Sequence, residues 1–163
     1  MARTNIYLKL DGIDGESIDE THTGWIELDS FKWAVHNDAS FAIGQGGQAT
    51  QGHIDKISVD KVCDKASITL FKNCTTGKHI ASGIISCLKL DGDSRVEYLK
   101  IDLTDIIVAK VDWSGAGADA LIKESVELDF AEFQKVFTLQ EDKGGPSGGV
   151  IEFAYNRQTS KAK

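Results

Sequence analysis

The stretch KESVELDFAEFQKVFTL, residues 123–139, determines the fold class of this chain. Val126 and Leu128 alternate with polar residues, so their side chains share one face of an extended strand. Phe133 and Phe137 continue the apolar pattern at the opposite parity. Because successive side chains of a strand point to opposite faces, this change of phase predicts either two strands or one bent strand.

Further strands are predicted on both sides of this stretch. The apolar pattern of residues 23–36 changes phase, which predicts a β-bulge near Asp29 and Ser30. The Asp-Gly-Asp-Ser turn at residues 91–94 lies between two extended segments and is typical of a hairpin. The complete set of extended segments comprises residues 5–11, 23–36, 54–62, 80–90, 96–103, 106–113, 123–139 and 150–157.

One segment, residues 65–75, has helical periodicity. Ile68, Phe71 and Cys74 recur every third residue, with Leu70 alongside, and predict one apolar stripe on the helix. Asp64 can cap the helix by accepting hydrogen bonds from its first free amides, and a glycine follows its end. We therefore expect a single helix among the strands.

The sequence predicts a mainly β, single-domain β-barrel of two antiparallel sheets, with one α-helix at about residues 65–75 on its side. A chain of 163 residues fits one domain, residues 1–163. Residues 37–52 are predicted to form an extended glycine-rich loop. A flexible tail is expected from about residue 158.

Composition restricts the classes of function. The formal net charge of −7, from 25 acidic and 18 basic residues, disfavours binding to nucleic acid. No apolar run is long enough to span a bilayer, so membrane insertion is not expected. The N-terminus lacks the apolar segment of a secretory signal peptide, so a chain that leaves the cell must take another route. The three cysteines form no CxxC pair and are expected to be free thiols.

No arrangement of residues in the sequence predicts catalysis, a metal ion or another cofactor. His22, His36, His53 and His79 are dispersed, and each is interpreted as a surface or turn residue. The glycines of residues 37–52 lead into a strand, whereas a phosphate-binding loop leads into a helix.

The glycine-rich loop is too long for a plain hairpin turn. It is either a flexible loop in solvent or an arm that lies on a neighbouring subunit, where glycine allows two backbones to approach closely. We favour the arm. This interpretation predicts a subunit interface that includes Gly44, Gln45, Gly46, Gly47, Gln48 and Gly52.

A series of short motifs spans essentially the whole chain. DGIDGES at residues 11–17 is followed by Thr21-His22, by SFKW at residues 30–33, by the glycine-rich residues 44–52, and by motifs at residues 64–67, 74–79, 96–101, 124–131 and 153–156. In this order the motifs resemble the Hcp family (haemolysin-coregulated proteins), the tube subunits of bacterial type VI secretion. The family often has serine where Lys32 stands here.

The resemblance implies a β-barrel with a side helix, six copies of which form a ring. The rings stack into a tube that is expelled from a contractile sheath, so the expected partners are further copies of the chain and the sheath, spike and baseplate components. Small effector proteins can travel in the lumen. The resemblance implies no metal, nucleotide or active site. It places the chain in the cytoplasm until the machine secretes it without a signal peptide.

Three surfaces follow as hypotheses from this implied assembly. Ring stacking is assigned to the acidic turn with Asp91, Gly92 and Asp93 at one end of the barrel, and to the Arg157 region at the other. Attraction between an acidic turn and a basic region is weakened by salt. Lys32 is out of phase with its aromatic neighbours, so it leaves the core and is assigned to the lumen.

A different class of function remains as an alternative, a barrel that binds a small ligand or a carbohydrate. The acidic residues 11–20 and the tryptophans Trp25, Trp33 and Trp113 suit such a barrel. A hydrolase with a dispersed site is a third interpretation. Rings with a central hole distinguish the tube subunit from both alternatives, which would be compact monomers.

Overall fold

The computed structural model describes residues 4–41, 46–47, 50–140 and 146–163. Within these residues the chain is mainly β, with one helix, as predicted. The elements are β1 (Thr4–Leu10), β2 (Ile26–Leu28), β3 (Ser30–Lys32), β4 (Val35–His36), β5 (His53–Ile54), β6 (Ile57–Val62), α1 (Ala66–Thr76), β7 (Ile80–Asp91), β8 (Ser94–Ser114), β9 (Lys123–Gln140), β10 (Pro146–Asn156) and β11 (Lys161–Ala162).

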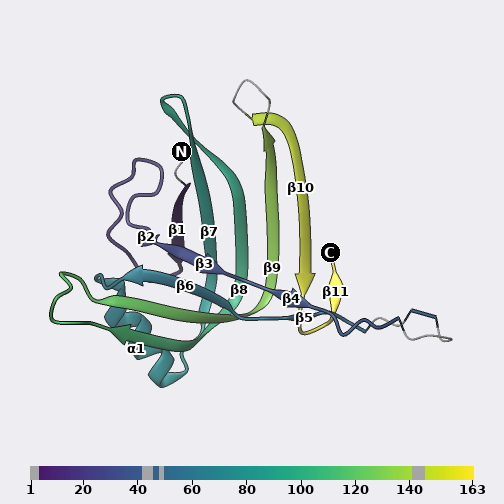
Figure 1. The fold of residues 1–163 in the computed structure, drawn as a ribbon, viewed down its shortest axis with the longest axis horizontal. Helices are drawn as coiled ribbons and strands as arrows, with labels where there is room; N and C mark the ends of the chain where they lie inside the picture. Colours follow the sequence, from purple (N-terminus) through teal and green to yellow (C-terminus); the bar gives the residue numbers. More distant parts are fainter. Residues whose placement is uncertain (1–3, 42–45, 48–49, 141–145) are drawn as a thin grey trace.

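Antiparallel pairing joins most strands in the order β11-β10-β9-β8-β7-β1-β2, and β6 pairs with both β3 and β9. The long strands stand side by side, while β3 and β6 run across them (Figure 1). The phase change predicted near Asp29 is a break between β2, which pairs with β1, and β3, which pairs with β6. There the amide of Asp29 donates to the carbonyl oxygen of Asp60 over 2.8 Å. Since β2 and β3 have different partners, hydrogen bonding around the barrel is not continuous.

Strands β8 and β9 bend at the same level. Thr104 pairs with Glu132 and Ile106 with Phe130, while Asp105 between them has a left-handed φ of 55°. The buried parity of both strands changes across this site. Residues 123–139 therefore belong to one bent strand, β9. The two strands predicted at residues 96–103 and 106–113 are likewise a single strand, β8.

The core lies where the two sets of strands cover each other. Its fully buried members include Ile57 and Val59 of β6 and Leu128 of β9, as the predicted phases require. Burial of such side chains contributes about 25 cal/mol per Å² of apolar surface. The chain end differs from expectation, because the tail predicted to be flexible from about residue 158 turns back and forms β11 beside the end of β10.

The helix α1 lies within one residue of the predicted range and ends at Gly77, whose φ is 69°. The predicted apolar stripe is correct only in part. Leu70 is buried and Cys74 packs against the core, but Ile68 and Phe71 are exposed. The buried residues of the helix are Ala66, Ser67, Leu70 and Asn73.

A buried ionic cluster beneath α1 explains this orientation. The ammonium of Lys61, wholly removed from solvent, donates to Asp64 Oδ1 over 2.9 Å and to Ser67 Oγ over 3.1 Å. It also lies 3.5 Å from Glu124 Oε1, an equally buried carboxylate of β9. Asp64 Oδ1 accepts a hydrogen bond from the amide of Ala66, the first residue of the helix, but Lys65 and not Asp64 occupies the N-cap position. Since a buried charge needs partners, Ser67 must face the barrel.

The N-terminal loop is held in place by His22, which was predicted to be a surface or turn residue. It lies in a turn, where its amide donates to the carbonyl of Asp19, but it is not on the surface. The His22 ring is buried, and its Nε2 lies 3.0 Å from Ser86 Oγ of β7. Ser86 in turn donates its proton to the Glu97 carboxylate. Ser86 is completely buried, so this hydroxyl–imidazole contact cannot serve a substrate.

We expect Lys61→Met to reduce the free energy of unfolding by about 3–5 kcal/mol, because it leaves the Glu124 carboxylate buried without a counter-charge. The double variant Lys61→Met/Glu124→Gln should recover part of that loss, since no isolated charge remains. Urea unfolding followed by circular dichroism measures both values. Equal stability of the wild type and Lys61→Met would contradict the structural role of the cluster.

Stability is also expected to depend on His22 at mildly acidic pH. Burial lowers the pKa of His22, although the charge of Glu97 partly opposes that effect. The unfolded chain then binds a proton at a higher pH than the folded chain, so the free energy of unfolding falls as the pH drops from about 7 to about 5. His22→Gln should show a smaller decrease over this range in the same unfolding measurement. Identical pH slopes for the variant and the wild type would exclude this contribution.

Candidate functional site

A two-stranded root holds the glycine-rich loop, which we call the arm (residues 37–52). Val35 pairs with Ile54 and His36 with His53, and these two pairs make up the sheet of β4 and β5. The described residues of the arm, 37–41, 46–47 and 50–52, project away from the body of the molecule (Figure 1). It is predicted to contact a neighbouring subunit, and its root determines the direction in which it leaves the barrel.

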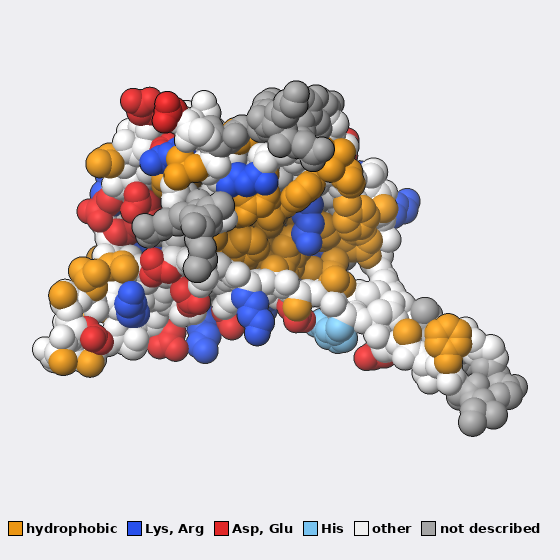
Figure 2. Space-filling view, turned by 45° about the horizontal axis from the view of Figure 1, so that its top comes forward, with side chains coloured by type: hydrophobic (Ala, Val, Ile, Leu, Met, Phe, Trp, Pro, Cys, Tyr) orange, Lys and Arg blue, Asp and Glu red, His pale blue; other side chains and the backbone are white. Residues whose placement is uncertain are grey.

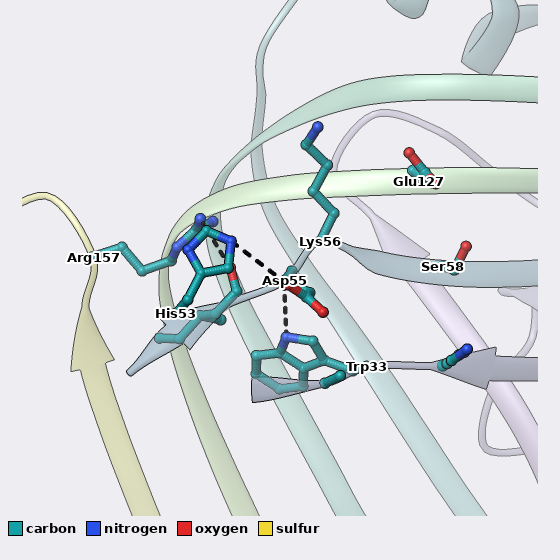
Figure 3. Close-up of a pocket in the computed structure, with 10 residues that line it drawn as sticks. Trp33, His53, Asp55, Lys56, Ser58, Glu127 and Arg157 are labelled. Carbon is teal, nitrogen blue, oxygen red and sulfur yellow. Dashed lines mark hydrogen bonds and ion pairs between the residues drawn. The ribbon is translucent and has the colours of Figure 1, made fainter. Parts of the chain in front are cut away.

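Asp55 fixes the root to the barrel. Its backbone carbonyl accepts a hydrogen bond from Trp33 Nε1 over 3.0 Å, and its amide donates to the carbonyl of Ala34 over the same distance. Its carboxylate lies 3.6 Å from His53 Nε2 (Figure 3). The direction of the arm therefore depends on contacts between the segment that joins β3 to β4 and the segment that joins β5 to β6.

A polar cavity of about 540 Å³ opens beside this root (Figure 3). Lys32, Lys56 and Arg157 contribute cationic side chains to its lining, and Asp55 and Glu127 contribute carboxylates. Lys32 is exposed, as its phase predicted. The structure thus brings together Lys32 and Arg157, which the sequence analysis had assigned to different surfaces.

Arg157 has partners within its own chain. Its guanidinium forms an ion pair with Asp129 of β9 and donates to the carbonyl of Phe130 over 2.9 Å. It also lies 5.0 Å from the centre of the Phe130 ring and reaches the carbonyl of Ile54 over 3.4 Å. Arg157 therefore connects the end of β10, the bend of β9 and the root of the arm.

An apolar cavity of about 380 Å³ lies on the other side of the root. Its aromatic lining is contributed by Trp33, Phe133, Phe153 and Tyr155. The Trp33 and Phe133 rings are 4.9 Å apart and nearly perpendicular, a favourable arrangement for aromatic pairs. Lys135 places its ammonium 4.0 Å from the centre of the Trp33 ring, and burial lowers the pKa of this amine.

The apolar cavity is part of a larger uncovered surface on β9 and β10. Figure 2 shows apolar side chains gathered in the hollow between the long strands and the base of the arm. Phe137, Leu139, Ile151 and Phe153 are all exposed. We call this surface, together with the four aromatic residues of the cavity lining, the aromatic face. The aromatic face was not predicted as an interaction site, although the shared parity of Ile151 and Phe153 indicated one apolar side of β10.

Part of the predicted subunit interface can be placed. Gly46 and Gly47 are exposed on the arm, and Gly52 lines the apolar cavity beside the Val35 side chain. Gly47 lies against the Phe41 ring, where a Cβ would have no room. Gly44, Gln45 and Gln48 lie outside the described residues.

The residues assigned to ring stacking lie at opposite ends of the long strands (Figure 1). Gly92, with a φ of 61°, forms the turn between β7 and β8, and Asp93 beside it is exposed. Asp91 ends β7 at the same turn. Arg157 follows the other end of β10. The assignment of these residues to ring stacking stays a prediction.

Catalytic and membrane functions gain no support from the described residues. No group of three or more His, Cys, Asp or Glu side chains among them is arranged to hold a metal ion. None of their helices is both long and apolar enough to cross a membrane. The thiols of Cys63, Cys74 and Cys87 are free, and burial raises the pKa of Cys87 to about 11.

Comparison with known sequences identifies one family. A family model described as "Type VI secretion system effector, Hcp" matches residues 7–137. The chain is also 31% identical to Protein hcp1 of Pseudomonas aeruginosa over 159 residues, which cover 97% of this chain and 98% of that protein.

Solved structures agree with the sequence comparison. A structure described as that of a type six secretion system protein superposes with a TM-score of 0.91, at 26% identity over 99% of this chain and 100% of the other. The crystal structure of Hcp1 from Salmonella typhimurium gives a TM-score of 0.78 at 34% identity and covers 100% of both chains.

Proposed function

The chain belongs to the Hcp family of type VI secretion tube proteins, and we propose that six copies of it close into a ring and that the rings stack into the inner tube. One observation supports this proposal most strongly. The aromatic face leaves Phe137, Ile151 and Phe153 uncovered on a single copy. Contiguous apolar surface of this kind marks an interaction site.

A ring requires head-to-tail contacts, in which one surface meets a different surface of the next copy. We assign the aromatic face and the arm to one side of that contact, including Gly46, Gly47 and Gly52, as well as Gly44, Gln45 and Gln48. A hydrogen bond from Gln51 Nε2 to the hydroxyl of Tyr155 connects the arm to the aromatic face within one copy. The two surfaces can therefore act as one continuous interface.

Ring stacking is assigned to the two ends of the long strands. The turn with Asp91, Gly92 and Asp93 would meet the end that carries Arg157 on the next ring. The polar cavity beside Arg157 is also lined by Lys56, whose positive charge favours an acidic partner. Because Arg157 is already paired with Asp129, Lys56 would supply most of the attraction.

The remaining parts of the function follow from a hollow tube. Lys32 would face the lumen, where small effector proteins would be carried, and the sheath, spike and baseplate would be the external partners. The chain would act by assembly and not by catalysis. It would reach the cell exterior through the secretion machine without a signal peptide.

The alternative of a carbohydrate-binding barrel has less support. Trp25 packs on His22, Trp33 lies in the apolar cavity, and Trp113 contacts Phe71 of the helix. The three tryptophans thus lie in three different places and do not form one site, as this alternative had required, although Trp33 shares the apolar cavity with Phe133, Phe153 and Tyr155.

Shortening the arm tests the ring interface. A variant that replaces residues 38–50 with a short glycine turn should fold, because the strand pairs of the root remain. It should sediment as a monomer under conditions in which the wild type forms rings. Circular dichroism and the urea midpoint serve as the controls for folding. Rings of unchanged size from this variant would exclude the arm as an interface.

The charge assignment predicts that tubes depend on salt. Raising the ionic strength from about 0.05 M to about 0.5 M should shorten the stacks seen in electron micrographs, because surface attraction is screened. Asp93→Asn should shorten them already at low salt. Asp14→Asn removes the same charge from an exposed site on the N-terminal loop and should leave their length unchanged. Equal shortening by both variants would point to net charge and contradict the assigned contact.

A further inference from the structure

The outer side of the helix carries an apolar surface that the core does not use. We call it the helix patch, and it consists of Ile68 and Phe71 of α1 with Trp113, Leu121 and Ile122 near the turn between β8 and β9. All five side chains are exposed, Ile68 to 68% of its surface. The centres of the Phe71 and Trp113 rings lie 5.3 Å apart, so the helix contacts β8 through these two side chains. A surface of this kind on a folded chain marks a contact with another molecule.

The orientation of the helix keeps this patch on the outside. Ser67 is fixed toward the barrel by the buried ammonium of Lys61 at 3.1 Å. Ile68 and Phe71 therefore cannot turn inward without breaking the ionic cluster. The exposure of the patch is a consequence of buried contacts and not of a loosely packed helix.

The arm carries a single large aromatic side chain among its described residues, Phe41. This ring is 89% exposed. Gly47 lies beside this ring, close enough that a Cβ built there would be 2.1 Å from the ring atom Cε1. Exposed aromatic side chains on projecting segments are typical anchors of protein interfaces.

The two features lie on opposite sides of the molecule. In Figure 1 the arm projects to the right, while α1 and the turn between β8 and β9 lie at the left, at a similar height along the long strands. A ring whose axis follows the long strands would bring the right side of one copy against the left side of the next. A closed head-to-tail ring requires two such different and complementary surfaces.

We infer that Phe41 of one copy inserts into the helix patch of the neighbouring copy and anchors the ring contact. The inference rests on the proposed ring and names the surface that receives the arm. Charges agree with the pairing. The arm contains one acidic residue, Asp38, and no basic one, whereas the helix contains Lys72 and no acidic residue.

Sedimentation velocity over a range of protein concentrations tests the contribution of Phe41. Phe41→Ala and Phe71→Ala should each raise the concentration at which half the protein is in rings by at least about tenfold, the effect expected of an anchor side chain. Ile18→Ala is the matched control, because Ile18 is 92% exposed on the N-terminal loop and belongs to neither surface. The control should assemble like the wild type.

The location of the contact is tested by placing the photoreactive residue p-benzoylphenylalanine at position 41 and mapping its cross-links by mass spectrometry. We expect cross-links between copies to residues 68–71, 113 and 121–122. Cross-links to the aromatic face, or wild-type assembly of both Phe41→Ala and Phe71→Ala, would overturn the inference while leaving the ring intact. Wild-type protein that never assembles would instead contradict the proposed function, and the inference with it.

Discussion

The shared bend of β8 and β9 at Asp105 is the constraint on which the rest of the structure depends. Both strands turn at this bend. The half of β9 before the bend pairs with β6 and completes the barrel together with β3, and the half after the bend pairs with β10 in the sheet of long strands (Figure 1). Side chains on one half are enclosed. Phe137 and its neighbours on the other half have no covering layer within the same chain.

This division explains why the molecule suits assembly. A chain of this size can bury a complete core, and the cluster around Leu128 shows that it does so. The remaining apolar surface is therefore not a sign of an unfinished core. Much of it lies on the aromatic face and on the outer side of α1, two places separated by the width of the molecule. When two different, complementary surfaces lie on opposite sides of a subunit, copies bind head to tail, and they form a closed ring if the rotation between neighbouring copies divides a full turn evenly.

Much of the fold could be predicted from sequence, because the alternation of apolar and polar residues along a strand shows which of its faces is buried. The phase changes near Asp29 and between Phe130 and Phe133 located the break and the bend. The orientation of α1 could not be predicted, because it depends on the buried partners of Lys61, which come from distant segments. The buried state of His22 depends in the same way on Ser86.

The site was predictable only in part, for the same reason. The glycine content of residues 37–52 indicated an arm, and the phase of Lys32 placed it outside the core. The aromatic face forms only when β9 and β10 pair beside the root of the arm, which local periodicity does not reveal. Native mass spectrometry of the wild-type protein, with electron micrographs of the same sample, tests the account most directly. We predict a particle of six copies with a central hole, and a single copy at every concentration and ionic strength would contradict it.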